Sequence, residues 1–235
     1  MKKETTHNII GDLHGSDVWK SLVDNSLINV FVGDFFDPYS YSITYKMCRD
    51  NFLQIIEYKR QHPETVILWG NHEYHYLMDG EIPERYSRYD FGHAQEIKEL
   101  LHNHADSFNG IAYSLNNMYL VTHAGVSTYW YWSWIDMYAD QTPDEVAEQI
   151  NNLWLLNKRA FSVTENRKNA YNNNESAQSP IWMRPPAIQY YNIFANTPYS
   201  QIFGHTPCDS IVNDNGLICV DCLRSDQAKE KTLII

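Results

Sequence analysis

The sequence has few cysteines, no long apolar run and a shortage of basic residues. Four cysteines in 235 residues are too few for a disulfide framework. No stretch approaches the length of a membrane-spanning helix, and the charged residues 1–6 lead into only a short apolar pair. We therefore expect neither a signal peptide nor a membrane partner, and we expect a cytoplasmic protein.

Negative charge predominates. Lysine and arginine total 18 against 29 aspartates and glutamates, which gives a formal net charge of −11. General nucleic-acid binding relies on basic side chains that neutralise phosphates, so we expect no such partner. Bound divalent cations would offset part of this charge. With 43% hydrophobic residues the chain can bury one substantial core, and we expect a single domain over residues 1–235.

Five apolar stretches have the composition of buried strands, and four of them end at a glycine. They cover residues 8–10, 28–32, 65–69, 118–122 and 201–203. Helices are predicted over 42–60 and 95–101, because apolar residues recur there at helical spacing. A hairpin is expected from 110 to 122 across Asn116 and Asn117, which tolerate a positive φ. This alternation of strands and helices indicates an α/β fold.

The strand pattern lapses between about residues 126 and 200, where we expect a helical insertion. One helix in it has clear start signals, namely Thr142 as cap, Pro143 at the first helical position and Glu145 completing a capping box. An aromatic cluster at 129–134 precedes that helix. We interpret its rings as packing for the insertion, with stacking on a nucleobase as the alternative.

Each of the five strand ends finishes in side chains that bind metal ions. These candidate ligands are Asp12, His14, Asp34, Asn71, His123 and His205. A single histidine beside a strand is usually structural, but five such ends at one sheet edge would rarely coincide by chance. Carboxylate, imidazole and amide donors without thiolate suit Mn²⁺, Fe or Zn²⁺. Six ligands are too many for one catalytic ion, so we expect two ions, roughly 3.5–4 Å apart, sharing one carboxylate.

In order along the chain, these segments resemble the motifs of the calcineurin-like metallophosphoesterases. The matching segments are Asp12-Leu13-His14, Gly33-Asp34 with Asp37, Gly70-Asn71-His72-Glu73, His123-Ala124-Gly125 and Gly204-His205. The glutamate after Asn-His and the compact spacing make the chain most similar to the phosphoprotein (Ser/Thr) phosphatase branch and its bacterial and phage relatives. The resemblance implies a layered α/β fold, a two-layered β-sandwich flanked by helices, with a dimetal site at the strand ends.

The resemblance also implies a role for each candidate ligand. Asp12 and His14 would hold the first ion, Asp34 would bridge, and Asn71, His123 and His205 would hold the second. The cofactors would be two divalent transition metal ions, with manganese expected first and iron or zinc as alternatives. A hydroxide bridging the two ions would be the nucleophile.

His72 resembles the family's general acid, and Asp37 resembles the carboxylate that orients it and raises its pKa. Pro38 departs from the motif of the phosphatase branch, which has at this position an arginine that binds phosphate. Proline has neither a charge nor a hydrogen-bond donor. Arg184 is the expected partial substitute, because a guanidinium can bind two phosphate oxygens. The alternative is that Arg184 is an ordinary surface residue. Asp221 is either a partner of a metal-bound histidine or an ordinary strand-end residue.

The implied function is a dimetal phosphomonoesterase of the Ser/Thr protein phosphatase-like kind, acting on a phosphoprotein or small phosphate esters. An alternative is hydrolysis of a nucleotide phosphoanhydride or phosphodiester, as in the diadenosine-tetraphosphatase-like relatives. The proline at position 38 is compatible with this alternative, because a diester carries less charge than a monoester and needs an arginine clamp less. A remote alternative is a metal-free binding module, but such proteins are expected to have lost ligands that this sequence retains.

Overall fold

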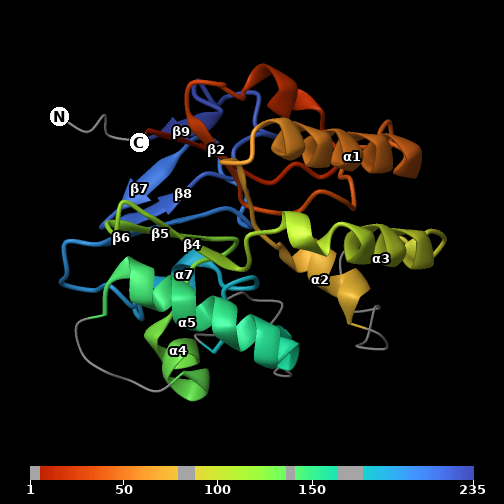
Figure 1. Cartoon of the computed structure of the whole chain (residues 1–235). Coiled ribbons are helices and arrows are strands. Elements are labelled where there is room, and N and C mark those ends of the chain that lie inside the picture. Colours follow the sequence, from red (N-terminus) through yellow and green to blue (C-terminus); the bar gives the residue numbers. More distant parts are fainter. Residues whose placement is uncertain (1–5, 79–87, 136–140, 164–176) are drawn as a thin grey trace.

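Two mixed β-sheets form the centre of the molecule (Figure 1). The computed structural model describes residues 6–78, 88–135, 141–163 and 177–235. The first sheet has the order β3-β2-β1-β9, with β1 His7–Ile10, β2 Ile28–Phe31, β3 Val66–Ile67 and β9 Thr232–Ile234. The second has the order β4-β5-β6-β8-β7, with β4 Ala112–Leu115, β5 Tyr119–Thr122, β6 Ser200–Phe203, β7 Val212–Asp214 and β8 Leu217–Cys219.

The inner strands of each sheet run parallel. β1, β2 and β3 are parallel neighbours in the first sheet, and β5, β6 and β8 are parallel neighbours in the second. The outer strands β9, β4 and β7 are antiparallel to the strands beside them. Loops that follow parallel strands leave a sheet at the same end, so each sheet presents its polar loops together.

Aliphatic side chains from both sheets pack between the layers. Ile9 and Val30 from the first sheet share one fully buried cluster with Val121 and Ile202 from the second. The alternate residues of the same strands, such as Phe31, point outward into a second cluster beneath the helices. Burial on both faces explains why these strands are almost continuously apolar in sequence.

Helices cover the outer faces of the sandwich. α1 (Tyr45–Gln61), α2 (Asn71–Leu77) and α3 (Ala94–Asn103) lie on one side in Figure 1, and α4 (Thr128–Trp134) and α5 (Pro143–Leu156) lie below the second sheet. α5 packs on β4 and β5. The short helical turns are η1 (Val18–Ser21), η3 (Ala105–Ser107), η4 (Lys158–Phe161) and α7 (Pro185–Ile188). In the ranges that the structure describes, no helix is long and apolar enough to cross a membrane.

The predicted α/β sandwich with helices between β5 and β6 is confirmed. The predicted capping box and the predicted hairpin turn are confirmed as well. The Thr142 side chain accepts a hydrogen bond from the Glu145 amide, and the Glu145 carboxylate accepts one from the Thr142 amide. Asn116 and Asn117 turn the β4–β5 hairpin with φ angles of 53° and 51°. These features are local, which is why sequence alone identifies them.

Three details of the prediction were wrong. The candidate ligands do not share one sheet edge, because they follow strands of two different sheets. The strand expected at 65–69 forms only Val66–Ile67, and Leu68 adds an isolated bridge. The sequence analysis also missed α2. Its residues from Asn71 to Tyr76 are all buried, so it has no exposed face and therefore no helical periodicity to detect.

The aromatic cluster at 129–134 forms α4 and only partly serves as packing. Trp130 and Tyr131 are buried, and the indole Nε1 of Trp130 donates to the Ala160 carbonyl at 3.0 Å. Trp132 and Trp134 are about half exposed, at 54% and 46%. The packing interpretation therefore holds for the two buried rings.

The inter-sheet core gives a stability prediction. Ile202 is fully buried between the layers, whereas Leu156 at the end of α5 is 86% exposed. Ile202→Ala should lower the free energy of unfolding by about 2–5 kcal/mol, because it removes buried methylenes and leaves a cavity. Leu156→Ala is the control and should change it by less than about 0.5 kcal/mol. Urea denaturation of both variants measures this, and equal losses would contradict the packing described above.

Candidate metal centre

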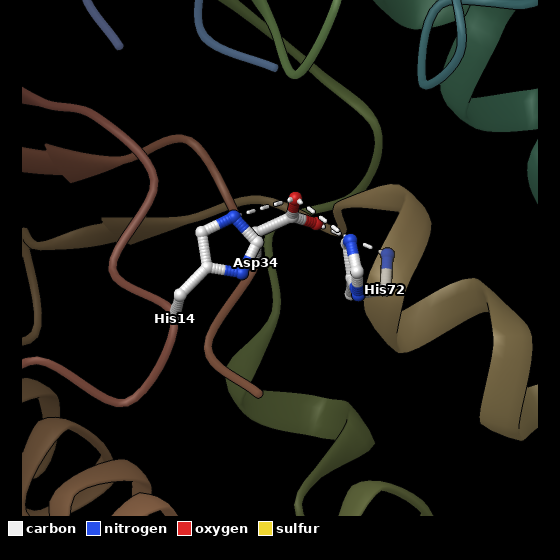
Figure 2. A group of neighbouring side chains, drawn as sticks. All are labelled: His14, Asp34 and His72. Atoms are coloured by element: carbon white, nitrogen blue, oxygen red, sulfur yellow. Dashed lines mark hydrogen bonds and ion pairs between the residues drawn. The ribbon is translucent and has the colours of Figure 1, made fainter. Parts of the chain in front are cut away.

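The carboxylate of Asp34 is the point on which the polar loops converge. Its Oδ2 atom lies 3.4 Å from His123 Nε2, 3.6 Å from His14 Nε2 and 3.9 Å from His72 Nε2. Figure 2 shows this carboxylate between the rings of His14 and His72. All four side chains are almost fully buried. One buried oxygen shared by three imidazoles is the geometry expected of a bridging ligand, with room for ions between the atoms.

The ring orientation of His14 leaves a lone pair directed at this oxygen. Its Nδ1 lies 3.0 Å from the Phe36 carbonyl, which can only accept, so Nδ1 carries the proton. Burial, the largest cause, lowers the pKa of His14 to about 3, so the ring is neutral at pH 7. Its Nε2 then bears no proton and faces Asp34 Oδ2 and, at 4.0 Å, Asp12 Oδ2. Three electron pairs that face each other in this way suit a cation.

His123 shows the same logic on the other side of Asp34. Its Nδ1 lies 2.8 Å from the Val32 carbonyl, and its Nε2 lies 2.8 Å from Asn71 Oδ1 and 3.2 Å from His205 Nδ1. Burial lowers the pKa of His123, but the charges of Asp34 and Asp12 outweigh it and raise the pKa to about 10. The surroundings of Nε2 thus strongly favour positive charge, which a metal ion supplies as well as a proton does.

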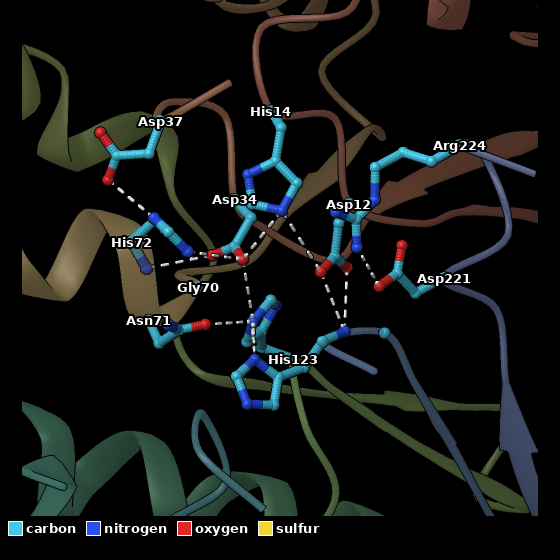
Figure 3. A network of polar contacts seen from close by, with 12 residues as sticks. Asp12, His14, Asp34, Asp37, Gly70, Asn71, His72, His123, Asp221 and Arg224 are labelled. Atoms are coloured by element: carbon cyan, nitrogen blue, oxygen red, sulfur yellow. Dashed lines mark hydrogen bonds and ion pairs between the residues drawn. The ribbon is translucent and has the colours of Figure 1, made fainter. Parts of the chain in front are cut away.

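All six sequence-predicted ligands are brought together. Asp12 lies beside His205, whose amide is 3.0 Å from each of the two Asp12 carboxylate oxygens. Figure 3 shows the groups from both sheets around the same point, including Asp12, His14, Asp34, Asn71 and His123. Their donor types and their convergent lone pairs fit divalent ions, with Asp34, His123 and His205 forming one group close enough to share an ion.

Several residues of the centre have a left-handed backbone. The φ angles are 46° at His14, 58° at Asp34, 58° at Asp37 and 62° at His205. Such angles cost of order 1 kcal/mol at a non-glycine residue and persist where the surrounding structure enforces them. The backbone strain is therefore concentrated where the ligand side chains must turn toward one another.

Glycines in these loops allow close approach more than tight turning. A Cβ atom on Gly33 would lie 2.5 Å from the Gly70 amide nitrogen, and one on Gly70 would lie 2.3 Å from Asp34 Oδ1. Gly33 has a φ of 109°, but Gly70 has an ordinary φ of −98°. The glycine at position 70 is therefore not needed for an unusual backbone angle. At Gly70 the missing side chain lets the loops after β2 and β3 touch.

Glu73 ties those two loops together. Its Oε2 accepts hydrogen bonds from the Asp34 amide at 2.8 Å and the Gly70 amide at 3.1 Å, and its Oε1 accepts one from the Phe35 amide at 2.7 Å. Burial and then the charge of Asp34 raise the pKa of Glu73 to about 7. Sequence reasoning noted Glu73 only as part of a motif. The spacing from Gly70 is that of a capping box, which was the available signal for its role.

His72 and Asp37 form a buried pair at the edge of the centre. His72 Nδ1 lies 2.7 Å from Asp37 Oδ2, and the Tyr76 hydroxyl donates to Asp37 Oδ1. Burial lowers the pKa of His72, but Asp34 and Asp37 outweigh it and leave the pKa above its usual value. The amide of His72 also donates to Asp34 Oδ1 at 3.0 Å, which fixes the ring beside the candidate bridge.

Arg184 is half-buried, and one end of its guanidinium is already engaged. Its Nη1 donates to the His205 carbonyl at 2.6 Å and contacts Thr206 Oγ1 at 3.3 Å. Its Nε has no hydrogen-bond partner among the described residues. Arg184 is thus no plain surface residue, because it supports the loop that carries a candidate ligand.

Sequence reasoning missed Arg224. Its Nη2 lies 3.4 Å from Asp221 Oδ2, and its guanidinium carbon lies 3.9 Å from the centre of the Tyr39 ring. In the described part of the chain, Asp221 has this ion pair and no hydrogen bond to a histidine, so the proposed link to a metal-bound ring is not seen. Nothing in the sequence relates positions 39 and 224, which only the fold brings together.

Comparisons with known proteins give a family match and a likeness in fold. The family model for calcineurin-like phosphoesterases matches residues 8–217. A solved structure of a protein serine/threonine phosphatase from Saccharomyces cerevisiae, described as similar to human phosphatase PP5, aligns with a TM-score of 0.54. It is 17% identical, and the alignment covers 93% of this chain and 67% of that one, a likeness that concerns the fold. No curated protein matches the sequence significantly.

The position of Glu73 gives a prediction at pH 8, where its carboxylate is ionised. Glu73→Gln should lower the free energy of unfolding by about 1–3 kcal/mol, because an amide NH₂ cannot accept from a buried backbone N–H. Mn²⁺ affinity should fall about 10–100-fold, as the loop that holds Asp34 loosens. Glu148→Gln makes the same chemical change at an exposed position of α5 and should alter neither quantity. Unchanged metal affinity in Glu73→Gln would refute the role given to Glu73.

Proposed function

This chain belongs to the calcineurin-like phosphoesterase family and is a metallophosphoesterase, and from that premise we propose that it is a phosphomonoesterase of the Ser/Thr protein phosphatase-like kind. Its substrate would be a phosphoprotein or a small phosphate ester. One observation carries the proposal: the Asp34 carboxylate lies within 3.9 Å of three imidazole nitrogens, one of which belongs to a histidine paired with Asp37. The site thus combines a ligand cluster with a proton donor.

We assign the ligands to two ions. Asp12 and His14 would hold the first, Asp34 would bridge, and Asn71, His123 and His205 would hold the second. We propose manganese, with iron or zinc as alternatives, because oxygen and imidazole donors without thiolate suit all three. When bound, two divalent ions make water a nucleophile at neutral pH and neutralise phosphoryl charge.

His72 would protonate the leaving oxygen of the ester. Its Nδ1 donates to Asp37, so the proton available for transfer is the one on Nε2, the nitrogen that faces Asp34 across 3.9 Å. Asp37 favours the charged form of the ring and fixes its orientation, and Tyr76 fixes Asp37 in turn. Burial lowers the pKa of His72, but the charges of Asp34 and Asp37 outweigh it, and the raised pKa favours retention of this proton.

Metal binding gives the first test of this proposal. Chelator-treated protein should rebind up to about two Mn²⁺ per chain. The metal-loaded protein should hydrolyse an aryl phosphomonoester faster than an aryl diester or a phosphoanhydride, and faster than metal-free protein does. Asn71→Ala should weaken one of the two binding events, because it removes a donor of the second ion alone. Asn152→Ala on the exposed face of α5 is the control. Calorimetry and a substrate panel that includes a phosphopeptide measure this.

Protein that binds no metal and hydrolyses no ester would overturn the proposal, and faster turnover of a dinucleoside polyphosphate would favour the anhydride alternative.

The role of His72 gives a second test. His72→Gln should keep its metal but lose about 10²–10⁴-fold in kcat, with a smaller loss for esters whose leaving group is a good one. In the wild type, kcat should fall as the pH rises through the elevated pKa of His72, because the general acid must be protonated. Asp37→Asn lowers that pKa, so the alkaline limb should move to lower pH. His102→Gln on the exposed side of α3 is the control. A leaving-group dependence identical to that of the wild type would exclude His72 as the proton donor.

A further inference from the structure

Arg224 lies at the edge of the candidate centre in a segment that follows β8. Figure 3 shows its side chain joined to Asp221. The Asp221 carboxylate is completely buried, whereas the Arg224 side chain is 30% exposed. The guanidinium therefore has one end toward the interior and another toward solvent. A cation in that position can meet a ligand that enters from outside.

Two groups fix the plane of this guanidinium. Asp221 holds one nitrogen at 3.4 Å, and the Tyr39 ring lies beneath the guanidinium carbon at 3.9 Å. Tyr39 in turn packs edge-on against His14, with 4.6 Å between the ring centres. Arg224 is thus one aromatic ring away from a candidate metal ligand. This support reduces the conformational entropy that an arginine loses when it binds an anion.

The hydrogen-bonding capacity of Arg224 is largely unused. A guanidinium has five N–H donors. Among the described residues, Arg224 contacts Asp221 through Nη2 and makes a side-chain hydrogen bond with Tyr39, which leaves other N–H groups for a ligand. Arg184 and Arg88 near the centre each donate to a backbone carbonyl, of His205 and Pro38 respectively, whereas the contacts of Arg224 are with side chains.

We propose that Arg224 binds the non-bridging phosphoryl oxygens of the substrate, held ready for this by Asp221 and Tyr39. The proposal rests on the function proposed above and deepens it by naming the residue that selects the substrate's charge. Pro38 carries no donor, and Arg184 is partly committed to the loop of His205. Arg224 combines a fixed orientation with partial exposure, and its contacts within the described residues bind no backbone loop.

The proposal implies a preference for monoesters. A phosphomonoester presents three non-bridging oxygens and nearly two negative charges, whereas a diester presents two oxygens and one charge. A guanidinium gains most from a doubly charged group that accepts two parallel hydrogen bonds. Arg224 would therefore bind a monoester, or its product inorganic phosphate, more tightly than a diester.

The test compares inorganic phosphate binding to the Mn²⁺-loaded wild type and to Arg224→Ala, by calorimetry. Charge-assisted hydrogen bonds contribute enough that the Kd for phosphate should rise roughly 10- to 100-fold. In kinetics, KM for an aryl monoester should rise by a similar factor while that for the matched aryl diester changes less than about 5-fold. Arg224→Lys should lie in between, because an ammonium keeps the charge and loses the planar fork. This variant also keeps the test open if Arg224→Ala does not fold.

Arg88→Ala is the matched control. Arg88 also lies over the Tyr39 ring, at 4.5 Å, but its Nη1 donates to a backbone carbonyl. Its removal should change the Kd for phosphate by less than about 3-fold. Equal effects of Arg88→Ala and Arg224→Ala, or an unchanged Kd in Arg224→Ala, would overturn the proposal. Wild-type protein that binds phosphate but hydrolyses no ester would refute the proposed function instead, and the calorimetric comparison would still decide the role of Arg224.

Discussion

The three hydrogen bonds that the Glu73 carboxylate accepts are the constraint on which the centre depends. Two of them join the first turn of α2 to the loop after β2 and hold the Asp34 amide while that residue has a φ of 58°. The third closes the capping box at Gly70. Without an acceptor, three buried backbone N–H groups would each lose an interaction that cannot be replaced by water. The loop would then relax toward an ordinary backbone conformation, and the Asp34 carboxylate would turn away from the imidazoles it now faces.

The centre lies between two sheets and not on one. β1 delivers Asp12 and His14, β2 delivers Asp34 and β3 delivers Asn71, while β5 and β6 of the second sheet deliver His123 and His205. The sandwich core fixes the distance between the layers, so ligands from opposite sheets can meet only if their loops bend inward. The left-handed backbone at His14 and His205 supplies that bend. The stability of the buried core thus compensates for strain stored at the ligand loops.

The convergence of the candidate ligands could be predicted from the sequence because chemistry and position coincide there, with a side chain able to bind metal shortly after each of β1, β2, β3, β5 and β6. The fold class followed from the same alternation of strands and helices. Other parts could not be predicted, for physical reasons. α2 is buried on every side and shows no periodicity, and the left-handed conformation of His14 depends on contacts with another loop. Arg224 reaches Tyr39 across 185 positions through tertiary folding alone, which no local pattern encodes.

Asp221 connects the candidate metal centre with the substrate-binding role proposed for Arg224. Burial, the largest cause, raises the pKa of Asp12, and the negative charge of Asp221 raises it further, so the two carboxylates disfavour each other's ionised forms. A cation near either one relieves that repulsion. The guanidinium of Arg224 beside Asp221 is one such cation. A divalent ion held by Asp12 would be the other. The carboxylates of Asp12 and Asp221 would repel an anionic substrate by themselves, but they hold the cations that attract it. The ions and Arg224 should therefore act on the substrate together.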